Sequence, residues 1–216
     1  MKLKLSVLTV VSFWLVSAPH PATGLLQKHK SEAVRQSTKD AASLPLTLRG
    51  IPSKQIMVGQ QAKFLPDLAL VDQDGRQVRF YSDLIKGKNV LISFFYTTCS
   101  STCLRQGKAL SDLQKELGDR LGKDVFLISV TMDPKTDTPQ RLKTWSEQYG
   151  RRKGWTLVTG STAEMEKLVG HLTGNPLGRL ETHMAFIYLG NDKKNHWIAT
   201  NGLSAPKELI KQIEEL

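Results

Sequence analysis

One stretch of the sequence decides the fold: Val90-Leu91-Ile92-Ser93-Phe94-Phe95-Tyr96-Thr97-Thr98-Cys99-Ser100-Ser101-Thr102-Cys103. Its first half is an apolar run rich in β-branched and aromatic residues, which is typical of a strand buried on both faces of a sheet. From Cys103 to Leu117 the leucines recur at helical spacing, and Gly118 ends the pattern. The sequence therefore predicts a buried strand that leads into the N-terminus of a helix, with two cysteines at the junction.

Cys99 and Cys103 are the only two cysteines of the chain, and the three residues between them are one more than in the redox motif Cys-x-x-Cys. A thiolate beside a helix N-terminus is stabilised by unpaired N–H groups and by the helix dipole. A disulfide between cysteines so close in sequence closes a small loop and adds little stability. The pair therefore indicates a redox role or a soft metal site, and both alternatives remain open at this point.

The N-terminus has the pattern of an export signal. Lys2 and Lys4 precede an apolar stretch, residues 5–16, and Val16-Ser17-Ala18 resembles a cleavage site, although Pro19 argues against clean cleavage there. The apolar stretch is shorter than the ~20 residues of a membrane span. We interpret residues 1–18 as a signal peptide or membrane anchor, and we expect the protein in a compartment where disulfides persist.

The net charge of +10 is concentrated at the N-terminal end. Residues 1–58 carry eight Lys and Arg against two acidic residues, whereas residues 59–216 carry 22 against 18. We interpret residues 19–58 as a basic linker that anionic lipid attracts, and residues 59–216 as the globular domain. Basic residues interleaved with aromatic ones, as nucleic acid requires, are absent, so no nucleic-acid partner is expected. Lys193-Lys194 is interpreted as a pair of solvated loop residues and not as part of a patch.

The order of predicted elements indicates an α/β domain. Strands that alternate with helices imply a parallel core, and a late hairpin adds antiparallel strands. The predicted elements are a hairpin at 68–80 turning at Asp74-Gly75, a short helix or turn at 81–88, a strand at 90–96, a helix at 103–117, a strand at 125–131, a helix at 138–149, a strand at 155–158, a helix from Ser161 or Thr162 to 172, a hairpin at 184–200 and a helix at 206–216. The sequence therefore predicts a thioredoxin-like fold with an N-terminal β-hairpin extension.

This fold predicts a third residue at the dithiol. In thioredoxin-like proteins the loop before the late hairpin faces the two cysteines, and redox members carry a cis-proline there. Here that loop reads Glu181-Thr182-His183. Two thiolates and one imidazole form a soft set of three ligands that suits Cu(I), whereas zinc requires a fourth ligand. The sequence therefore favours one Cu(I) ion at Cys99, Cys103 and His183, and the histidine also permits Cu(II).

Three motifs in this order resemble the Sco/SenC family over residues 59–216. They are the stretch from Phe95 to Cys103, the segment Thr131-Met132-Asp133-Pro134-Lys135-Thr136-Asp137-Thr138-Pro139, and His183. The resemblance implies a thioredoxin-like copper protein that helps to assemble the binuclear copper centre of cytochrome c oxidase. It implies Cys99, Cys103 and His183 as copper ligands, with a copper-bearing oxidase subunit or another copper chaperone and a thiol reductant protein as partners. It also implies a membrane-tethered domain that faces the bacterial periplasm or the mitochondrial intermembrane space, and the signal-like N-terminus without an Arg-rich transit peptide favours the periplasm.

Two positions depart from the family pattern. Leu104 stands where the family usually has proline, which restores a backbone N–H, and Thr182 stands where an acidic residue often precedes the histidine. The loop from Asp133 to Pro139 has two interpretations: a partner-contact or site-edge loop, or turn chemistry in which Asp133-Pro134 ends the strand and Asp137 or Thr138 caps a helix. The second interpretation is favoured.

Two enzyme functions compete with the metallochaperone. In a thiol-disulfide reductase, Cys99 would attack a partner's disulfide and Cys103 would resolve the mixed disulfide. A peroxide-reducing enzyme of the same fold needs an arginine near the attacking cysteine, and Arg105 is the nearest one in sequence. The sequence favours the metallochaperone over both.

Overall fold

The computed structural model describes residues 56–57, 65–174, 176–177 and 185–216. The predictions for residues 1–18, for most of the linker and for His183 fall outside these residues. The elements are β1 (Ile56–Met57), β2 (Ala69–Asp72), β3 (Gln77–Arg79), π-helix η3 (Phe80–Ile85), β4 (Asn89–Phe95), α2 (Thr102–Leu117), 3-10 helix η4 (Gly118–Arg120), β5 (Val125–Thr131), α3 (Pro139–Glu147), β6 (Trp155–Thr159), α4 (Thr162–Thr173), β7 (Phe186–Asn191), β8 (His196–Asn201) and α5 (Pro206–Glu214).

The strands form one mixed sheet in the order β1-β8-β7-β4-β5-β6-β2-β3. The centre is parallel, since β4 pairs with β5 and β5 with β6 in the same direction. The late hairpin β7–β8 adds antiparallel strands beside β4, and the early hairpin β2–β3 adds them beside β6. The parallel core, the late hairpin and the N-terminal hairpin extension are as predicted from sequence.

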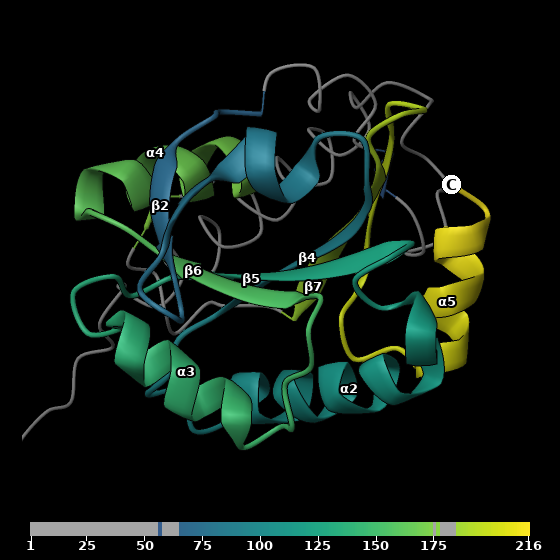
Figure 1. The fold of residues 1–216 in the computed structure, drawn as a ribbon, viewed down its shortest axis with the longest axis horizontal. Coiled ribbons are helices and arrows are strands. Elements are labelled where there is room, and N and C mark those ends of the chain that lie inside the picture. Colours follow the sequence, from purple (N-terminus) through teal and green to yellow (C-terminus); the bar gives the residue numbers. More distant parts are fainter. Residues whose placement is uncertain (1–55, 58–64, 175, 178–184) are drawn as a thin grey trace, which may run out of the picture. The chain divides into compact units, whose positions relative to one another are not determined.

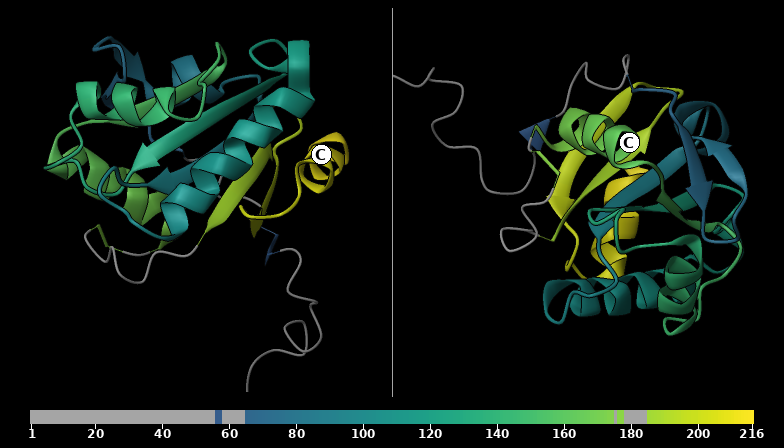
Figure 2. Two further views of the ribbon diagram at one scale, coloured as in Figure 1. Left: turned by 90° about the horizontal axis from the view of Figure 1, so that it is seen from below. Right: turned by 90° about the vertical axis from the view of Figure 1, so that its left-hand side faces the viewer.

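Helices cover both faces of this sheet (Figure 1). One face carries α2, α3 and α5, and the other carries α4 and η3; the right-hand view of Figure 2 shows α2 and α4 on opposite sides of the strands. Strand β4 contributes core side chains to both faces of the sheet, because successive side chains of a strand point to opposite faces. Leu91 and Phe95 pack with α2 and α3, whereas Val90, Ile92 and Phe94 pack with α4. This two-sided burial is what the apolar run predicted.

The helix starts follow from local side-chain chemistry. Thr138 caps α3, because its hydroxyl oxygen accepts the N–H of Arg141 and Pro139 occupies the first helical position. Ser161 caps α4 in a reciprocal capping box with Glu164. Of the alternatives left open by the sequence, Thr138 and Ser161 are therefore the capping residues.

Three details differ from the prediction. Strand β1 pairs with β8, but two residues are too short for a recognisable strand pattern. The segment expected to be a short helix or turn contains the π-helix η3. Helix α3 ends two residues before Tyr149, where its prediction ended. Among the described residues, no helix is long and apolar enough to cross a membrane.

Candidate metal centre

The two cysteines lie where β4 gives way to α2. Residues 96–101 connect the strand to the helix, and Cys103 is the second residue of α2. Cys99 is 6 % exposed and Cys103 is fully buried, in the core on the α2 face of the sheet. Both are free thiols. The predicted placement of two sulfurs at a helix N-terminus is therefore confirmed, and Cys99 is the less buried of the two residues.

The Cys99 thiol is surrounded by hydrogen-bond donors. The backbone N–H of Cys103 donates to its Sγ atom over 3.3 Å. Burial raises the pKa of Cys99, but hydrogen bonds from the Cys103 thiol, from the N–H groups of Ser101 and Cys103 and from the Tyr96 hydroxyl outweigh it and lower the pKa to about 7. Cys99 is therefore largely a thiolate at slightly alkaline pH.

The Cys103 thiol has the opposite environment. Burial raises its pKa to about 12, and the neighbouring Cys99 thiol acts in the same direction. A hydrogen bond from the backbone of Tyr96 opposes this shift without reversing it. The site thus pairs one sulfur with a lowered pKa and slight exposure with one protonated, fully buried sulfur.

Aromatic side chains wall the buried side of the dithiol. Trp145 packs against Phe95 and against Tyr149, with ring centroids 4.5 Å and 4.7 Å apart. Burial raises the pKa of Tyr149, and the charges of Cys103 and Cys99 raise it further. A Cβ atom on Gly107 would lie 2.5 Å from the Tyr149 ring, so glycine at this position of α2 lets the aromatic wall approach the helix.

Three residues that were not predicted as site residues act on Cys99 or on the loop that carries it. The Tyr96 side chain helps to lower the pKa of Cys99. The buried Asp137 carboxylate accepts the backbone N–H of Thr97, two residues before Cys99. Arg141, and not the exposed Arg105, reaches this loop, where its Nε donates to the Thr97 hydroxyl over 3.2 Å. Only the motif around Asp137 offered a sequence signal for any of these contacts.

The donor set of the described residues suits a soft metal ion. Two buried thiols that are not joined as a disulfide, one with its pKa lowered, are ligands that Cu(I) prefers. Among the described residues no cluster of three His, Cys, Asp or Glu side chains forms. His183, the predicted third ligand, lies outside the described residues. His171, which was predicted to be structural, is exposed on α4.

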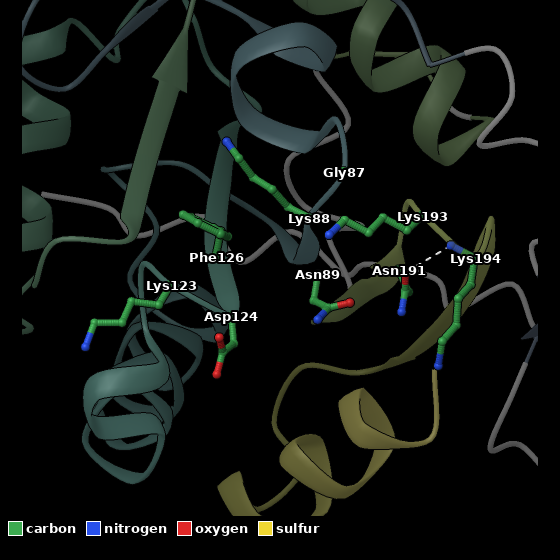
Figure 3. Close-up of a pocket in the computed structure, with 9 residues that line it drawn as sticks. All are labelled: Gly87, Lys88, Asn89, Lys123, Asp124, Phe126, Asn191, Lys193 and Lys194. Atoms are coloured by element: carbon green, nitrogen blue, oxygen red, sulfur yellow. Dashed lines mark hydrogen bonds between the residues drawn. The ribbon is translucent and has the colours of Figure 1, made fainter.

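A lysine-rich pocket of about 340 Å³ lies at the other end of the sheet, where β4 begins at Asn89 (Figure 3). Its four lysines come from three separate segments: Lys88, Lys123, Lys193 and Lys194. Figure 3 shows that Lys193 extends across the pocket toward Lys88 and Asn89, whereas Lys123 and Lys194 point away from it. Lys193 and Lys194 are exposed in the turn between β7 and β8, in agreement with their interpretation as solvated loop residues, and the sheet brings Lys88 and Lys123 from distant segments to the same pocket. The pocket is separate from the dithiol.

Fold and site together define a thioredoxin-like protein with a dithiol at the N-terminus of the helix after the central strand. The family model described as SCO1/SenC matches residues 57–216. The chain belongs to the SCO1/SenC family.

The relatives confirm the thioredoxin-like fold. The chain is 35% identical over 98 residues to the SCO1 protein homolog of Bacillus subtilis (strain 168), an alignment that covers 44% of this chain and 49% of the relative. The structure of BsSco, described as a member of the Sco family of cytochrome c oxidase assembly proteins with a disulfide switch, matches with a TM-score of 0.59 and 27% identity and covers 70% of this chain and 91% of BsSco.

A copper-bound structure is also similar. ScoI of Bradyrhizobium japonicum with copper bound matches with a TM-score of 0.57 and 25% identity, and the match covers 68% of this chain and 95% of ScoI. The chain spans about half the length of the curated relatives that it matches first.

Proposed function

We propose that this protein is a copper metallochaperone that binds one Cu(I) ion through Cys99, Cys103 and His183 and delivers it to the copper-bearing subunit of cytochrome c oxidase. The observation that carries the proposal is the pair of free thiols at the N-terminus of α2, in a chain of the SCO1/SenC family. Copper-bound ScoI, and the assembly role stated for the family of BsSco, support the cargo and the destination.

The two thiols have different roles in copper binding. Cys99 is the less buried sulfur and is mostly ionised just above pH 7, so it is the first ligand that an incoming ion meets. Cys103 must lose its proton to become the second thiolate. A disulfide between the two sulfurs removes both ligands at once, so copper loading and oxidation of the pair exclude each other. A thiol reductant protein is therefore a required partner.

Cu(I) titration against a competing chelator, without oxygen, tests the proposal. The wild-type protein is expected to bind one equivalent, Cys99→Ser and Cys103→Ser to abolish tight binding, and His183→Ala to weaken it. His171→Ala is the matched control, since His171 is exposed on α4. Equal affinity in the wild type and in the variants of all three ligands would contradict the proposal.

A second function, thiol-disulfide reductase, is favoured by the contrast between the two thiols. A Cys99 pKa of about 7 suits a nucleophile, and a buried Cys103 suits a resolving thiol. The Cys99 thiolate would attack a partner's disulfide, form a mixed disulfide and release one partner thiol. Cys103 would then attack the Cys99 sulfur and release the second thiol, so that the partner gains two electrons and the protein is left with a disulfide.

Reduction of insulin disulfides by the wild type, Cys99→Ser and His183→Ala separates the two functions. Turnover that depends on Cys99 and ignores His183 favours the reductase. Loss of Cu(I) binding in His183→Ala with no turnover in any variant favours the metallochaperone.

We also propose that residues 1–18 export the protein to the bacterial periplasm as a signal or anchor, and that residues 19–58 link them to the domain. The basic and apolar pattern of this segment supports the proposal. A phosphatase reporter that is active only outside the cytoplasm, fused after residue 58, is expected to be active. The same fusion without residues 1–18 is expected to be inactive, and equal activity of both would contradict export.

A further inference from the structure

A buried carboxylate lies at the base of the loop that carries Cys99. Asp137 is fully buried in the connection between β5 and α3. Its two oxygens accept the backbone N–H of Thr97 at 3.2 Å and 3.1 Å. They also accept the hydroxyl groups of Thr97 and Thr131, each at 2.5 Å. Four hydrogen bonds from two residues thus converge on one side chain.

These contacts join two neighbouring strands to the cysteine loop. Thr131 is the last residue of β5 and stands opposite Phe95, the last residue of β4. Thr97 follows two residues later, and Cys99 two residues after that. The Asp137 side chain therefore links the start of the Cys99 loop, at Thr97, to the C-terminal end of β5, at Thr131. Arg141 adds a contact from α3, because its Nε donates to the Thr97 hydroxyl.

Capping of α3 does not account for this carboxylate. Thr138 is the capping residue, and its own hydroxyl accepts the N–H of Arg141. Burial raises the pKa of Asp137 above its ordinary value, and the hydrogen bonds from Thr131 and Thr97 oppose this shift without reversing it. Burying a carboxylate is unfavourable unless hydrogen bonds compensate. All four of those hydrogen bonds come from the end of β5 and from the Cys99 loop. The hydrogen bonds that compensate for burial of the carboxylate therefore also hold that loop in place.

We propose that Asp137 is a positioning residue that acts through Thr97 to hold the loop in the conformation in which the Cys99 sulfur accepts the N–H of Cys103. The role of this conformation in copper loading rests on the proposed function. Its effect on the reactivity of the Cys99 thiol is independent of that function. Asp137 has no hydrogen bond to either cysteine among the described residues. It acts on the position of the Cys99 sulfur through the backbone of residues 97–99.

The pH profile of Cys99 alkylation by iodoacetamide, read by mass spectrometry, tests the proposal. Asp137→Ala is expected to raise the midpoint by about one unit, toward the ~8.5 of a free thiol, because the loop relaxes away from its N–H donors. Asp137→Asn keeps one acceptor oxygen and is expected to show a smaller rise. The direction of the change in midpoint decides the question. Loss of a negative charge near Cys99 would by itself stabilise the thiolate and lower the midpoint, whereas relaxation of the loop raises it. An unchanged or lowered midpoint in folded Asp137→Ala overturns the proposal.

Two further variants keep the test conclusive. Thr97→Val keeps the shape of the side chain and removes two hydrogen bonds of its hydroxyl, the one donated to Asp137 and the one accepted from Arg141. It keeps the backbone N–H of Thr97 on Asp137, so it is expected to raise the midpoint modestly, and it decides the question if the Asp137 variants fail to fold. Asp72→Asn is the matched control. Asp72 is 1 % exposed and accepts the N–H groups of Asp74 and Arg76 in the β2–β3 turn, so its loss is expected to lower stability without moving the midpoint.

A copper measurement separates this proposal from the proposed function. If the wild type binds Cu(I), Asp137→Ala is expected to bind it about tenfold more weakly, in line with a thiol pKa raised by about one unit. If the wild type binds no Cu(I), the metallochaperone fails, while the alkylation profile still decides the role of Asp137. Unchanged Cu(I) affinity in Asp137→Ala would count against the positioning role at the metal site.

Discussion

The backbone N–H of Cys103 points at the sulfur of Cys99, with 3.3 Å between the nitrogen and Sγ. This N–H belongs to the first turn of α2, where backbone donors have no partner within the helix. The cysteine spacing thus lets the second cysteine supply a donor to the first. The two sulfurs differ in ionisation because one faces these donors and the other faces the core.

The first prediction concerns the two thiols of the reduced protein. Cys99 is expected to react with iodoacetamide with a midpoint near pH 7, and Cys103 to stay unreactive until the pH approaches about 12. Peptide mapping after alkylation at a series of pH values measures both, with Cys103→Ser as the control for Cys99. A shared midpoint for both thiols would contradict the structure.

The second prediction concerns proton release on copper binding. At pH 8 Cys99 is mostly a thiolate and Cys103 is a thiol, so formation of two thiolate ligands releases about one proton. At pH 6 Cys99 is also protonated, so the two thiols together release about two protons, and His183→Ala leaves the imidazole proton out of the count. Calorimetry of Cu(I) binding in buffers with different ionisation enthalpies counts these protons. The same number at both pH values would show that Cys99 has an ordinary thiol pKa.

The third prediction concerns the hydroxyl of Tyr96. Tyr96→Phe removes one donor to Cys99, so the pKa of Cys99 is expected to rise while its other donors remain. Tyr188→Phe is the matched control, because the Tyr188 hydroxyl donates to the carbonyl of Leu172 beside α4. The pH midpoint of Cys99 alkylation is expected to be higher in Tyr96→Phe than in Tyr188→Phe. Equal midpoints would show that the Tyr96 hydroxyl does not affect the Cys99 thiol.

The fourth prediction concerns Leu104, which stands where the family usually has proline. The N–H groups that lower the Cys99 pKa belong to Ser101 and Cys103, and Leu104 is the third residue of α2, where proline is tolerated. Leu104→Pro is therefore expected to fold and to leave the Cys99 midpoint unchanged. A rise in that midpoint would mean that the Leu104 N–H also stabilises the thiolate.

The sequence predicted the parts of the site that local pattern determines. The apolar run of β4, the leucine spacing of α2 and the position of both cysteines between them all follow from periodicity. The contrast between the thiols could not be predicted, because it depends on which sulfur the surrounding helices bury. Burial is a property of the packed domain and not of the motif.

The contacts of Asp137 show the same limit. Its motif predicted a helix start, and Thr138 provides that cap. Its bond to Thr97 exists because β4 and β5 are parallel neighbours with Phe95 opposite Thr131, a register that the sequence does not state. The lysine pocket likewise depends on three segments that meet only in the folded sheet.

X-ray absorption at the copper edge of the Cu(I)-loaded protein tests the central claim most directly, because it counts the atoms bound to the metal. We expect two sulfur neighbours and one nitrogen neighbour in the wild type, with the nitrogen lost in His183→Ala and both sulfurs retained. A copper ion bound by nitrogen and oxygen alone, or a wild-type spectrum that His183→Ala leaves unchanged, would contradict it.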